Sequence, residues 1–355
     1  MLSVVISDLH LGTTSGRDVA TRPPVGERMV AAVEGADQIV LLGDVLELRE
    51  RPLRHVLERA RPVLEPLGDA AAGRRVLLVP GNHDHQLLGD RLAGDVLEPA
   101  SVWPVTEGDD LAGTLASWMP RAEVALAYPG VFLRDDVYAT HGHYLDAHLT
   151  VPRIESIAVS AVQRVVARGR APRSVREYEA IVAPLYDFLY RRAQGAPARA
   201  IRSQSYVSRR VWERVNGGRA GGLSAFLIGR VTIPGAVAVM NRIGLGPFNA
   251  EISGAELRRA GLQAMATVLS GMGIESRHVL FGHTHRPGPL PGDTEGWTLA
   301  SGMRLWNSGS WLYESALERG QGPSHPYWPG TVVHVGPEGE PALSNVLADF
   351  EPAVR

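Results

Sequence analysis

Short apolar runs that end in polar residues recur along the chain. Residues 3–6, 38–42, 76–79 and 279–281 are mostly apolar and rich in β-branched side chains, and each run is closed by polar residues or glycine. This pattern is typical of short strands that are buried on both faces. Strand-like patterns also occupy residues 304–307 and 331–335. The sequence therefore predicts an α/β fold whose strands are distributed over both ends of the chain.

Five polar blocks follow runs of this kind. In layered α/β proteins, ligands bind outside the carboxyl ends of strands, so loops far apart in sequence can meet at one edge. We therefore expect the five blocks to form one site. The blocks are Ser7-Asp8-Leu9-His10, Gly43-Asp44, Gly81-Asn82-His83-Asp84, His141-Gly142-His143 and Gly282-His283-Thr284-His285.

The middle of the chain has a different pattern. Apolar residues spaced by three and four predict helices in residues 154–166 and 178–189, and glycine and proline at 195–197 and 217–218 interrupt this periodicity. We expect a discontinuous catalytic domain formed by residues 1–144 and 276–355, with residues 145–275 inserted as a mainly helical cap. Residues 104–130 are rich in glycine and proline and are expected to run over the surface, with a short strand at 123–127.

The residue types in the five blocks suit a pair of divalent cations. Such a pair lies about 3.5–4 Å apart and needs oxygen ligands, imidazoles and one carboxylate that reaches both ions. His83 is then left over to protonate a leaving oxygen. Asp8 or Asp44 alone could cap a helix, and residues 81–84 alone could form a turn, but the ordered set of five blocks favours the metal site. The ligand set would be Asp8, His10, Asp44, Asn82, His141, His283 and His285.

These blocks resemble those of the calcineurin-like metallophosphoesterases. The resemblance covers about 150 residues at the two ends of the chain, and it implies a layered β-sandwich flanked by helices. It implies that Asp8, His10 and His285 hold one metal, that Asn82, His141 and His283 hold the other, and that Asp44 bridges them. His83 would be the general acid, oriented by Asp84. The metals would be two divalent ions, with Mn²⁺ expected and Fe or Zn as alternatives, and would activate a hydroxide for attack on phosphorus.

The closer resemblance is to the branch containing the UDP-2,3-diacylglucosamine pyrophosphohydrolases. It is carried by Ser-Asp-Leu-His-Leu at 7–11, by Glu47 three residues after Asp44, and by Gly-His-Thr-His-Arg-Pro at 282–287. The chain departs from that branch at two positions, because it has His83 where the branch has arginine and His143 where the branch has aspartate. These departures leave the substrate branch open. His143 follows a candidate ligand by two residues and could contact the substrate phosphate or support a ligand.

Composition narrows the possible chemistry. Cysteine is absent, which excludes disulfides and thiolate ligands and leaves the metals to oxygen and imidazole. Lysine is also absent, so all 36 basic residues are arginines, each able to present a planar fork to phosphate. The first strand begins almost at Met1, which leaves no room for a targeting segment. We therefore expect a cytoplasmic protein, with peripheral contact at the inner face of the membrane as a further possibility.

Positive charge is concentrated in the insertion. Residues 153–259 contain 18 arginines and 7 acidic residues, whereas the rest of the chain contains 18 arginines and 31 acidic residues. A basic cap would attract an anionic phosphate-containing substrate or an anionic membrane surface, although a solvated arginine-rich face is the alternative. Within the cap, residues 223–240 are unusually apolar but contain Arg230, which indicates an interfacial hairpin or a buried core rather than a membrane span.

Two functional classes remain open from the sequence, an enzyme and a non-catalytic scaffold, and the enzyme class contains two candidates. The leading hypothesis is a hydrolase of phosphodiester or diphosphate bonds in a nucleotide-linked or lipid-linked substrate. A nuclease or cyclic-nucleotide phosphodiesterase is the alternative, although the cap offers few of the basic and aromatic pairs that nucleic acid would favour, such as Tyr206 with Arg209. A scaffold that has lost catalysis is disfavoured, because His83 and every candidate ligand are present.

Overall fold

The computed structural model shows two compact units. One contains residues 1–143, 190–195 and 275–355, and the other contains residues 144–189 and 196–274. The structure describes residues 1–93, 97–106, 108, 110–195, 233–249, 253–314 and 321–351. No helix in these ranges has the length and apolar character required to cross a membrane.

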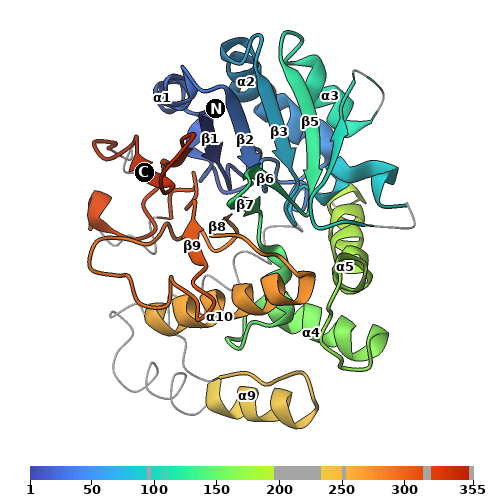
Figure 1. Ribbon diagram of the computed structural model, residues 1–355. Helices are drawn as coiled ribbons and strands as arrows, with labels where there is room; N and C mark the ends of the chain where they lie inside the picture. The colour runs from blue at the N-terminus through green and yellow to red at the C-terminus, as the bar shows by residue number, and fades with distance from the viewer. Residues whose placement is uncertain are drawn as a thin grey trace. The chain divides into compact units, whose positions relative to one another are not determined.

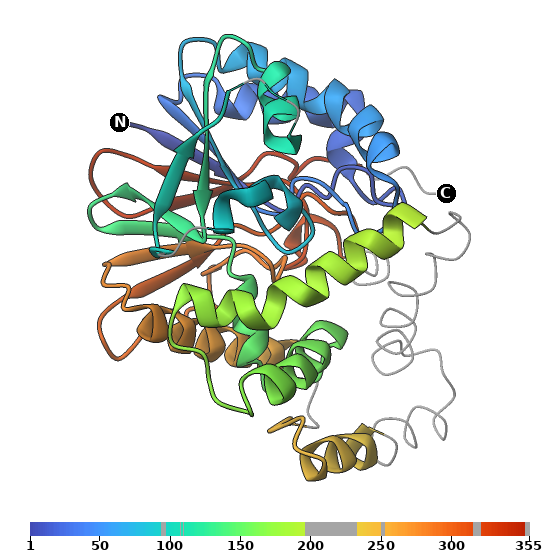
Figure 2. The same ribbon diagram turned by 90° about the vertical axis from the view of Figure 1, so that its right-hand side faces the viewer.

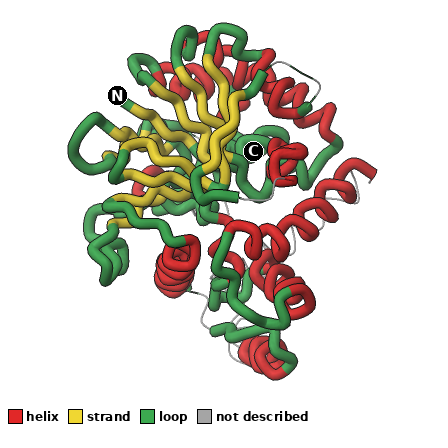
Figure 3. The backbone as a smooth tube through the Cα atoms, turned by 45° about the vertical axis from the view of Figure 1, so that its right-hand side comes forward, coloured by secondary structure: helices red, strands yellow, loops and turns green. Residues whose placement is uncertain are grey.

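The larger sheet of the first unit has seven strands (Figures 1 and 3). Four central strands run parallel: β1 (Ser3–Ile6), β2 (Gln38–Leu42), β3 (Arg75–Val79) and β5 (Glu123–Tyr128). The edges are antiparallel, with β10 (Thr331–Val335) and β11 (Ala342–Asn345) beyond β1, and β4 (Ser101–Pro104) beyond β5. The carboxyl ends of the four parallel strands therefore meet at one edge.

The smaller sheet has four strands in the order β6 (Gly130–Arg134), β7 (Val137–Thr140), β8 (His278–Phe281) and β9 (Arg304–Asn307). Strands β7, β8 and β9 are parallel, and Thr140 at the end of β7 pairs in register with Phe281 at the end of β8. The blocks beginning at His141 and Gly282 therefore leave the sheet side by side.

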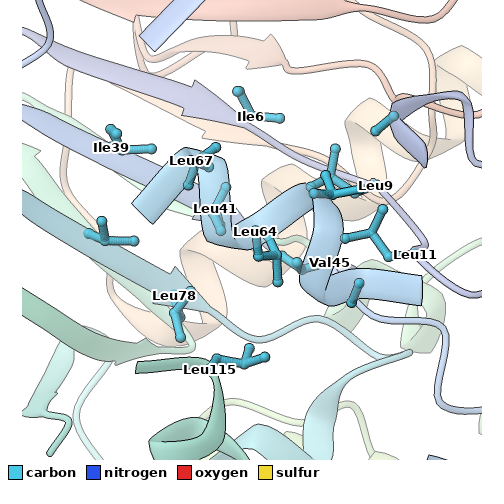
Figure 4. Packing of buried hydrophobic residues seen from close by; sticks show 14 of the residues in the cluster. Ile6, Leu9, Leu11, Ile39, Leu41, Val45, Leu64, Leu67, Leu78 and Leu115 are labelled. Carbon is cyan, nitrogen blue, oxygen red and sulfur yellow. The ribbon is translucent and has the colours of Figure 1, made fainter. Parts of the chain in front are cut away.

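Alternation along each strand divides the core into two layers. On β2, Ile39 and Leu41 pack on the helical side of the large sheet, where α1 (Pro23–Val33), α2 (Leu53–Ala70) and α3 (Leu111–Ser117) cover it (Figures 1 and 4). Val40 and Leu42 point to the other face and pack with residues of the small sheet such as Leu280. Fully burying a side chain of this size contributes about 1.5–3 kcal/mol relative to exposure. The expected α/β fold with two sheets and flanking helices is confirmed.

The second unit is helical in its described residues. It contains α4 (Ile154–Val166), most of α5 (Val175–Gly195), α9 (Ile233–Arg242) and α10 (Gly254–Met272), of which α4 and α5 are seen along their length in Figure 2. Helix α10 begins where Ser253 accepts a hydrogen bond from the backbone N–H of Glu256, and it ends at Gly273 in the left-handed conformation. The helices expected at 154–166 and 178–189 are confirmed, and α5 ends at the glycine expected to interrupt it.

Short 3-10 helices complete the described elements: η1 (Val19–Thr21), η2 (His85–Ala93), η3 (His143–Ala147) and η5 (Gly322–Ser324). The predicted strands at 3–6, 38–42, 76–79, 123–127, 279–281, 304–307 and 331–335 are all present, with shifts of at most one residue.

The expectation that residues 104–130 run over the surface was wrong for α3 and β5, although Pro104, Thr106, Gly108 and Asp110 are exposed. Strand β5 is paired on both sides in the large sheet, and Ala112 and Leu115 of α3 are fully buried in the core. Glycine and proline suggested a loop, but tertiary packing of the short apolar face of α3 outweighs this local preference. The apolar stretch at 223–240 lies outside the described residues up to residue 232, and its remainder belongs to α9.

Candidate metal centre

The loops that follow five parallel strands bring all seven predicted ligands together. Asp8 and His10 follow β1, Asp44 follows β2 and Asn82 follows β3, while His141 follows β7 and the histidines at 283 and 285 follow β8. Backbone hydrogen bonds tie these loops to one another, including Asp8 N–H to the Gly43 carbonyl at 3.0 Å and Gly282 N–H to the His141 carbonyl at 2.9 Å. The site therefore rests on the rigid edges of both sheets.

One cluster contains Asp8, His10 and His285. The Nε2 atoms of the two histidines are 3.2 Å apart, and His285 Nε2 is 3.3 Å from Asp8 Oδ1. These ligand atoms, one from each of the three residues, all lie within 4.8 Å of one another. Two imidazole nitrogens and a carboxylate oxygen at this spacing can hold a divalent cation.

A second cluster contains Asn82, His141 and His283. The Asn82 Oδ1 atom is 3.3 Å from His141 Nε2 and 3.0 Å from His283 Nδ1. The same amide oxygen lies 3.2 Å from Asp44 Oδ2. With its oxygen turned to this side, the amide presents an electron-pair donor beside the two imidazoles and the carboxylate, and such a set can hold a divalent cation.

Asp44 lies between the two clusters. Its Oδ2 atom is 3.2 Å from His141 Nε2 and 3.6 Å from His10 Nε2. Its other oxygen, Oδ1, accepts a hydrogen bond from the backbone N–H of His83 at 2.8 Å. The carboxylate is 1% exposed. The carboxylate therefore lies within reach of ligand atoms of both clusters.

The backbone of the ligand loops is strained. Among the described residues, six non-glycine residues have positive φ, and five of them are Asp8, His10, Asp44, His283 and His285. This conformation costs of the order of 1–3 kcal/mol per residue and persists where the surrounding structure enforces it. A side chain on Gly43 would collide with the His141 ring, so only glycine allows this close approach. The strain turns the ligand side chains inward.

The charge of the site fits a pair of cations. Burial would lower the pKa of His141, but the adjacent Asp44 carboxylate outweighs this and raises it to about 10. Burial opposes protonation of His10 as well, and Glu47 together with Asp44 raises its pKa to about 9. The carboxylates thus stabilise positive charge among the histidines, which divalent ions would supply when bound.

Hydrogen bonds to the outer ring nitrogens orient two ligands. His141 Nδ1 is 3.1 Å from the Leu42 carbonyl, and His10 Nδ1 is 3.1 Å from Glu47 Oε2. An acceptor at Nδ1 places the proton there and leaves the Nε2 lone pair directed at the site.

His83 is held by the same glutamate. Its Nδ1 atom is 2.8 Å from Glu47 Oε1, its ring packs edge-on against His10 at 4.6 Å between centroids, and its side chain is 21% exposed. Glu47 is buried, which would raise its pKa, but His83 and His10 hold that pKa well below the usual range. Glu47 is therefore an anion that binds both rings, and the Nε2 atom of His83 remains on the side of Asp44, 4.0 Å from Oδ2.

The Asp84 carboxylate binds backbone N–H groups, whereas the resemblance implied that it orients the His83 ring. Its carboxylate accepts backbone hydrogen bonds from Gly81 at 2.7 Å, Val45 at 2.7 Å and Leu46 at 3.3 Å. Burial and the neighbouring Asp44 raise its pKa to about 6. The carboxylate that contacts the His83 ring is Glu47, whereas Asp84 ties the loop after β3 to the loop after β2.

His143 is 1% exposed and lies behind the ligand His141, with 5.6 Å between the ring centroids. Its Nε2 atom is 3.0 Å from the hydroxyl of Tyr128. Burial and the neighbouring His141 hold the pKa of His143 well below its usual range. This environment suits a neutral ring that supports His141.

Two residues of the site received no role from the sequence. Glu47 entered the sequence analysis only as a residue of the motif. Its spacing from Asp44 was the signal that could have predicted its place in the site. Arg49 Nη1 lies 2.7 Å from the side-chain amide of Asn82, and no sequence pattern indicated this contact.

Part of the chain matches a known protein family, and solved structures of phosphatases are similar to it at low identity. Residues 1–172 match the sequence model of the family described as calcineurin-like phosphoesterase. A dimetal phosphatase from Danio rerio is similar in structure at 12% identity, covering 97% of this chain and 98% of that one, with a TM-score of 0.33. A cold-active protein-tyrosine phosphatase of a psychrophilic Shewanella species is similar at 15% identity, covering 95% of this chain and 75% of that one, with a TM-score of 0.28. A comparison with curated proteins finds no significant match.

The matched residues contain four of the five blocks, and the structure adds His283 and His285 from the fifth to the same clusters. This part of the chain, 172 of its 355 residues, is therefore similar in sequence to the calcineurin-like phosphoesterases.

Proposed function

We propose that the protein is a phosphoester hydrolase that uses two divalent metal ions. The observation that carries this proposal is the position of Asp44 Oδ2 between the two clusters of ligand atoms. Asp8, His10 and His285 would hold one ion, Asn82, His141 and His283 the other, and Asp44 both. When bound, such a pair supplies a nucleophilic hydroxide at neutral pH and neutralises charge on the phosphoryl group.

The protein's own groups provide the remaining acid-base chemistry. His83 is partly exposed beside Asp44, and its Nδ1 is held by the Glu47 carboxylate. A histidine held in this way can donate the Nε2 proton to the leaving oxygen, while the glutamate stabilises the imidazolium and fixes the ring. Asp84 contributes by holding the loop that carries His83 and Asn82.

Manganese is the proposed native metal, with iron and zinc as alternatives. The donor set combines imidazole nitrogens with carboxylate and amide oxygens, and the absence of cysteine excludes thiolate. Such mixed sets bind several first-row metals, so the availability of each metal contributes to the outcome.

For the substrate, we propose a phosphodiester or diphosphate bond in a nucleotide-linked or lipid-linked molecule. The concentration of arginine in residues 153–259 supports an anionic substrate. A nuclease or cyclic-nucleotide phosphodiesterase is the alternative. The aromatic and basic residues near 206–212 that bear on nucleic-acid binding lie outside the described residues.

A substrate panel tests this function. The Mn²⁺-loaded protein is assayed on phosphomonoesters, diesters and nucleotide-linked diphosphates, with Asp44→Asn as the blank. We expect metal-dependent hydrolysis confined to diesters or diphosphates. Activity on monoesters alone would contradict the proposed substrate bond. No activity on any class, with two ions bound, would contradict the proposed enzymatic function and favour the scaffold.

We further propose that the second unit contacts an anionic membrane, which would place a cytoplasmic protein at the inner membrane face. The carbonyl of Gly244, just beyond α9, accepts a hydrogen bond from Arg164 Nη1 of α4 at 3.1 Å, so the ends of these two helices lie together. Four large apolar side chains are exposed near these ends, and Arg168, Arg170 and Arg242 are exposed as well. The apolar side chains are Val165 (80% exposed), Val166 (51%), Val239 (59%) and Ile243 (53%).

An apolar patch with arginines at its border suits the headgroup region of anionic lipid, where each basic residue contributes about 1 kcal/mol. We expect the protein to co-sediment with phosphatidylglycerol vesicles, and expect replacement of Val165, Val166 and Ile243 by serine to lower the bound fraction severalfold. Val102→Ser, at a 39% exposed position in the other unit, is the control. Equal binding by the triple variant and the wild type would refute the membrane contact. Residues 223–232, the first part of the apolar stretch predicted to form an interfacial hairpin or a buried core, lie outside the described residues.

A further inference from the structure

Asn307 is the last residue of β9 and is fully buried. Strands β8 and β9 are parallel, and Asn307 pairs in register with Phe281, the last residue of β8. The loop that carries His283 and His285 begins at the next residue, Gly282. A buried amide therefore lies beside the loop that supplies a histidine to each of the two clusters.

The side chain of Asn307 holds this loop at two points. Its Nδ2 atom donates to the Gly282 carbonyl at 2.9 Å and to Thr284 Oγ1 at 3.0 Å. Its Oδ1 atom accepts a hydrogen bond from the backbone N–H of Gly309 at 2.9 Å, and this donor fixes which way the amide points. The two bonds from Nδ2 lie on either side of His283, and the second of them reaches the residue between the two histidines.

The backbone of Asn307 closes the far end of the same loop. Asn307 and Gly288 exchange two backbone hydrogen bonds, from Asn307 N–H to the Gly288 carbonyl at 2.8 Å and from Gly288 N–H to the Asn307 carbonyl at 3.1 Å. The loop from residue 282 to residue 288 is thus anchored to Asn307 at its start, in its middle and at its end.

Strain in the loop gives this anchor its importance. His283 and His285 have φ angles of 65° and 60°, in the left-handed region that residues other than glycine rarely adopt. Such a conformation persists where the surrounding structure enforces it. A loop released from Asn307 would relax toward ordinary backbone angles, and both imidazoles would turn away from their clusters.

The residues after Asn307 fix the anchor itself relative to the first ligand loop. Ser308 Oγ is 2.6 Å from Ser7 Oγ, and the backbone N–H of Trp311 donates to the Asp8 carbonyl at 3.0 Å. The segment after β9 therefore binds the loop that carries Asp8 as well as the loop that carries the two histidines.

We propose that Asn307 is a positioning residue for both metal ions, because its side-chain amide holds the strained loop from which His283 reaches one ion and His285 the other. This inference rests on the proposed function and adds to it the residue that keeps the loop after β8 in its ligating conformation. Asn307 binds the Gly282 carbonyl and the Thr284 hydroxyl, so it acts on the ions through the position of the two histidines. Replacing a residue that orients ligands in this way typically lowers metal affinity about 10- to 100-fold.

The experiment measures the affinity of the full chain for Mn²⁺ by calorimetry, at a temperature where circular dichroism shows the protein to be folded. We expect Asn307→Ala to weaken binding of both ions about 10- to 100-fold. Asn345→Ala is the matched control, because the Asn345 side chain makes the same kinds of bond at the end of β11, donating to the Pro329 carbonyl and accepting from the Leu347 N–H. The affinity of this control for Mn²⁺ is expected to equal that of the wild type.

Thr284 offers a milder pair of variants. Thr284→Val keeps the shape of the side chain but removes the oxygen that accepts from Asn307, whereas Thr284→Ser keeps that oxygen. We expect Thr284→Val to weaken binding of both ions severalfold and Thr284→Ser to bind them as the wild type does. The double variant Asn307→Ala/Thr284→Val is expected to bind Mn²⁺ about as tightly as Asn307→Ala, because both substitutions remove the same hydrogen bond.

Unchanged affinity for both ions in folded Asn307→Ala would overturn the inference, and so would a loss confined to one ion. An equal loss in Asn345→Ala, or equal losses in Thr284→Val and Thr284→Ser, would also overturn it, since the effect would then be a general loosening of the fold. If Asn307→Ala does not fold, the two Thr284 variants decide. A wild type that binds two ions and hydrolyses its substrate, with unchanged affinity in these variants, refutes this inference alone, whereas a wild type that binds fewer than two ions refutes the proposed function.

Discussion

Asp44→Asn is expected to lower kcat/KM by at least about 10³-fold. Asp44 Oδ2 lies beside ligands of both clusters, and an amide in its place presents a neutral oxygen or an NH₂ group to two cations. A loss of about 4 kcal/mol of transition-state stabilisation corresponds to this fold-change in kcat/KM, and a metal pair supplies several kcal/mol of such stabilisation. The measurement is steady-state turnover with metal content determined on the same sample.

The matched control is Asp69→Asn, which removes one carboxylate from an exposed pair with Arg121 on the surface. Its kcat/KM and metal content are expected to equal those of the wild type. Full activity of Asp44→Asn with two ions bound would show that the shared carboxylate is dispensable. It would contradict the assignment of Asp44 as the ligand that joins two metal ions.

His83→Ala is expected to lower turnover about 10²- to 10⁴-fold on a substrate with an alkoxide leaving group, the range that general acid catalysis contributes. The loss is expected to be much smaller with a p-nitrophenyl ester, because p-nitrophenolate leaves without protonation. His83 is 21% exposed and is oriented by Glu47, so its removal is expected to leave both ligand clusters in place. The measurement is the turnover of His83→Ala and of the wild type on both substrates at equal metal content.

Glu47→Gln provides the intermediate case. It keeps a hydrogen-bonding side chain but removes the negative charge that contacts both His83 and His10. We therefore expect a smaller loss of turnover than in His83→Ala, with the same dependence on the leaving group.

Equal losses of turnover on both leaving groups in His83→Ala would contradict proton donation and leave His83 as a substrate-positioning residue.

The strands, and the meeting of the candidate ligands in one place, could be predicted from sequence because both depend on local patterns. Continuous apolar runs such as residues 38–42 are required where a parallel strand is covered on both faces, as β2 is by the helices and by the small sheet. Asp44 and Asn82 could be expected to meet because each follows such a strand, and neighbouring parallel strands end at one edge.

The remaining features depend on contacts that no local pattern encodes. Helix α3 forms where glycine and proline suggested a loop, since its buried face packs in the core. Glu47 and Asp84 are both carboxylates close to His83 in the folded chain, and only the turn geometry after β3 directs Asp84 to backbone N–H groups and leaves the ring to Glu47. No sequence pattern distinguishes Arg49 from the other arginines among the 36 in the chain, because its contact with Asn82 joins two loops.

The parallel pairing of β7 with β8 has a consequence for the order of events during synthesis. The chain between these strands runs from residue 141 to residue 277, so the pair closes a long loop, and closure of long loops is slow compared with local folding. Asp8, Asp44, Asn82 and His141 leave the ribosome before the helical insertion, and His283 and His285 leave after it. Each cluster is one histidine short until then. On the proposed function, tight binding of metal would require β8, and a metal-loaded centre would show that both ends of the first unit have been synthesised and joined.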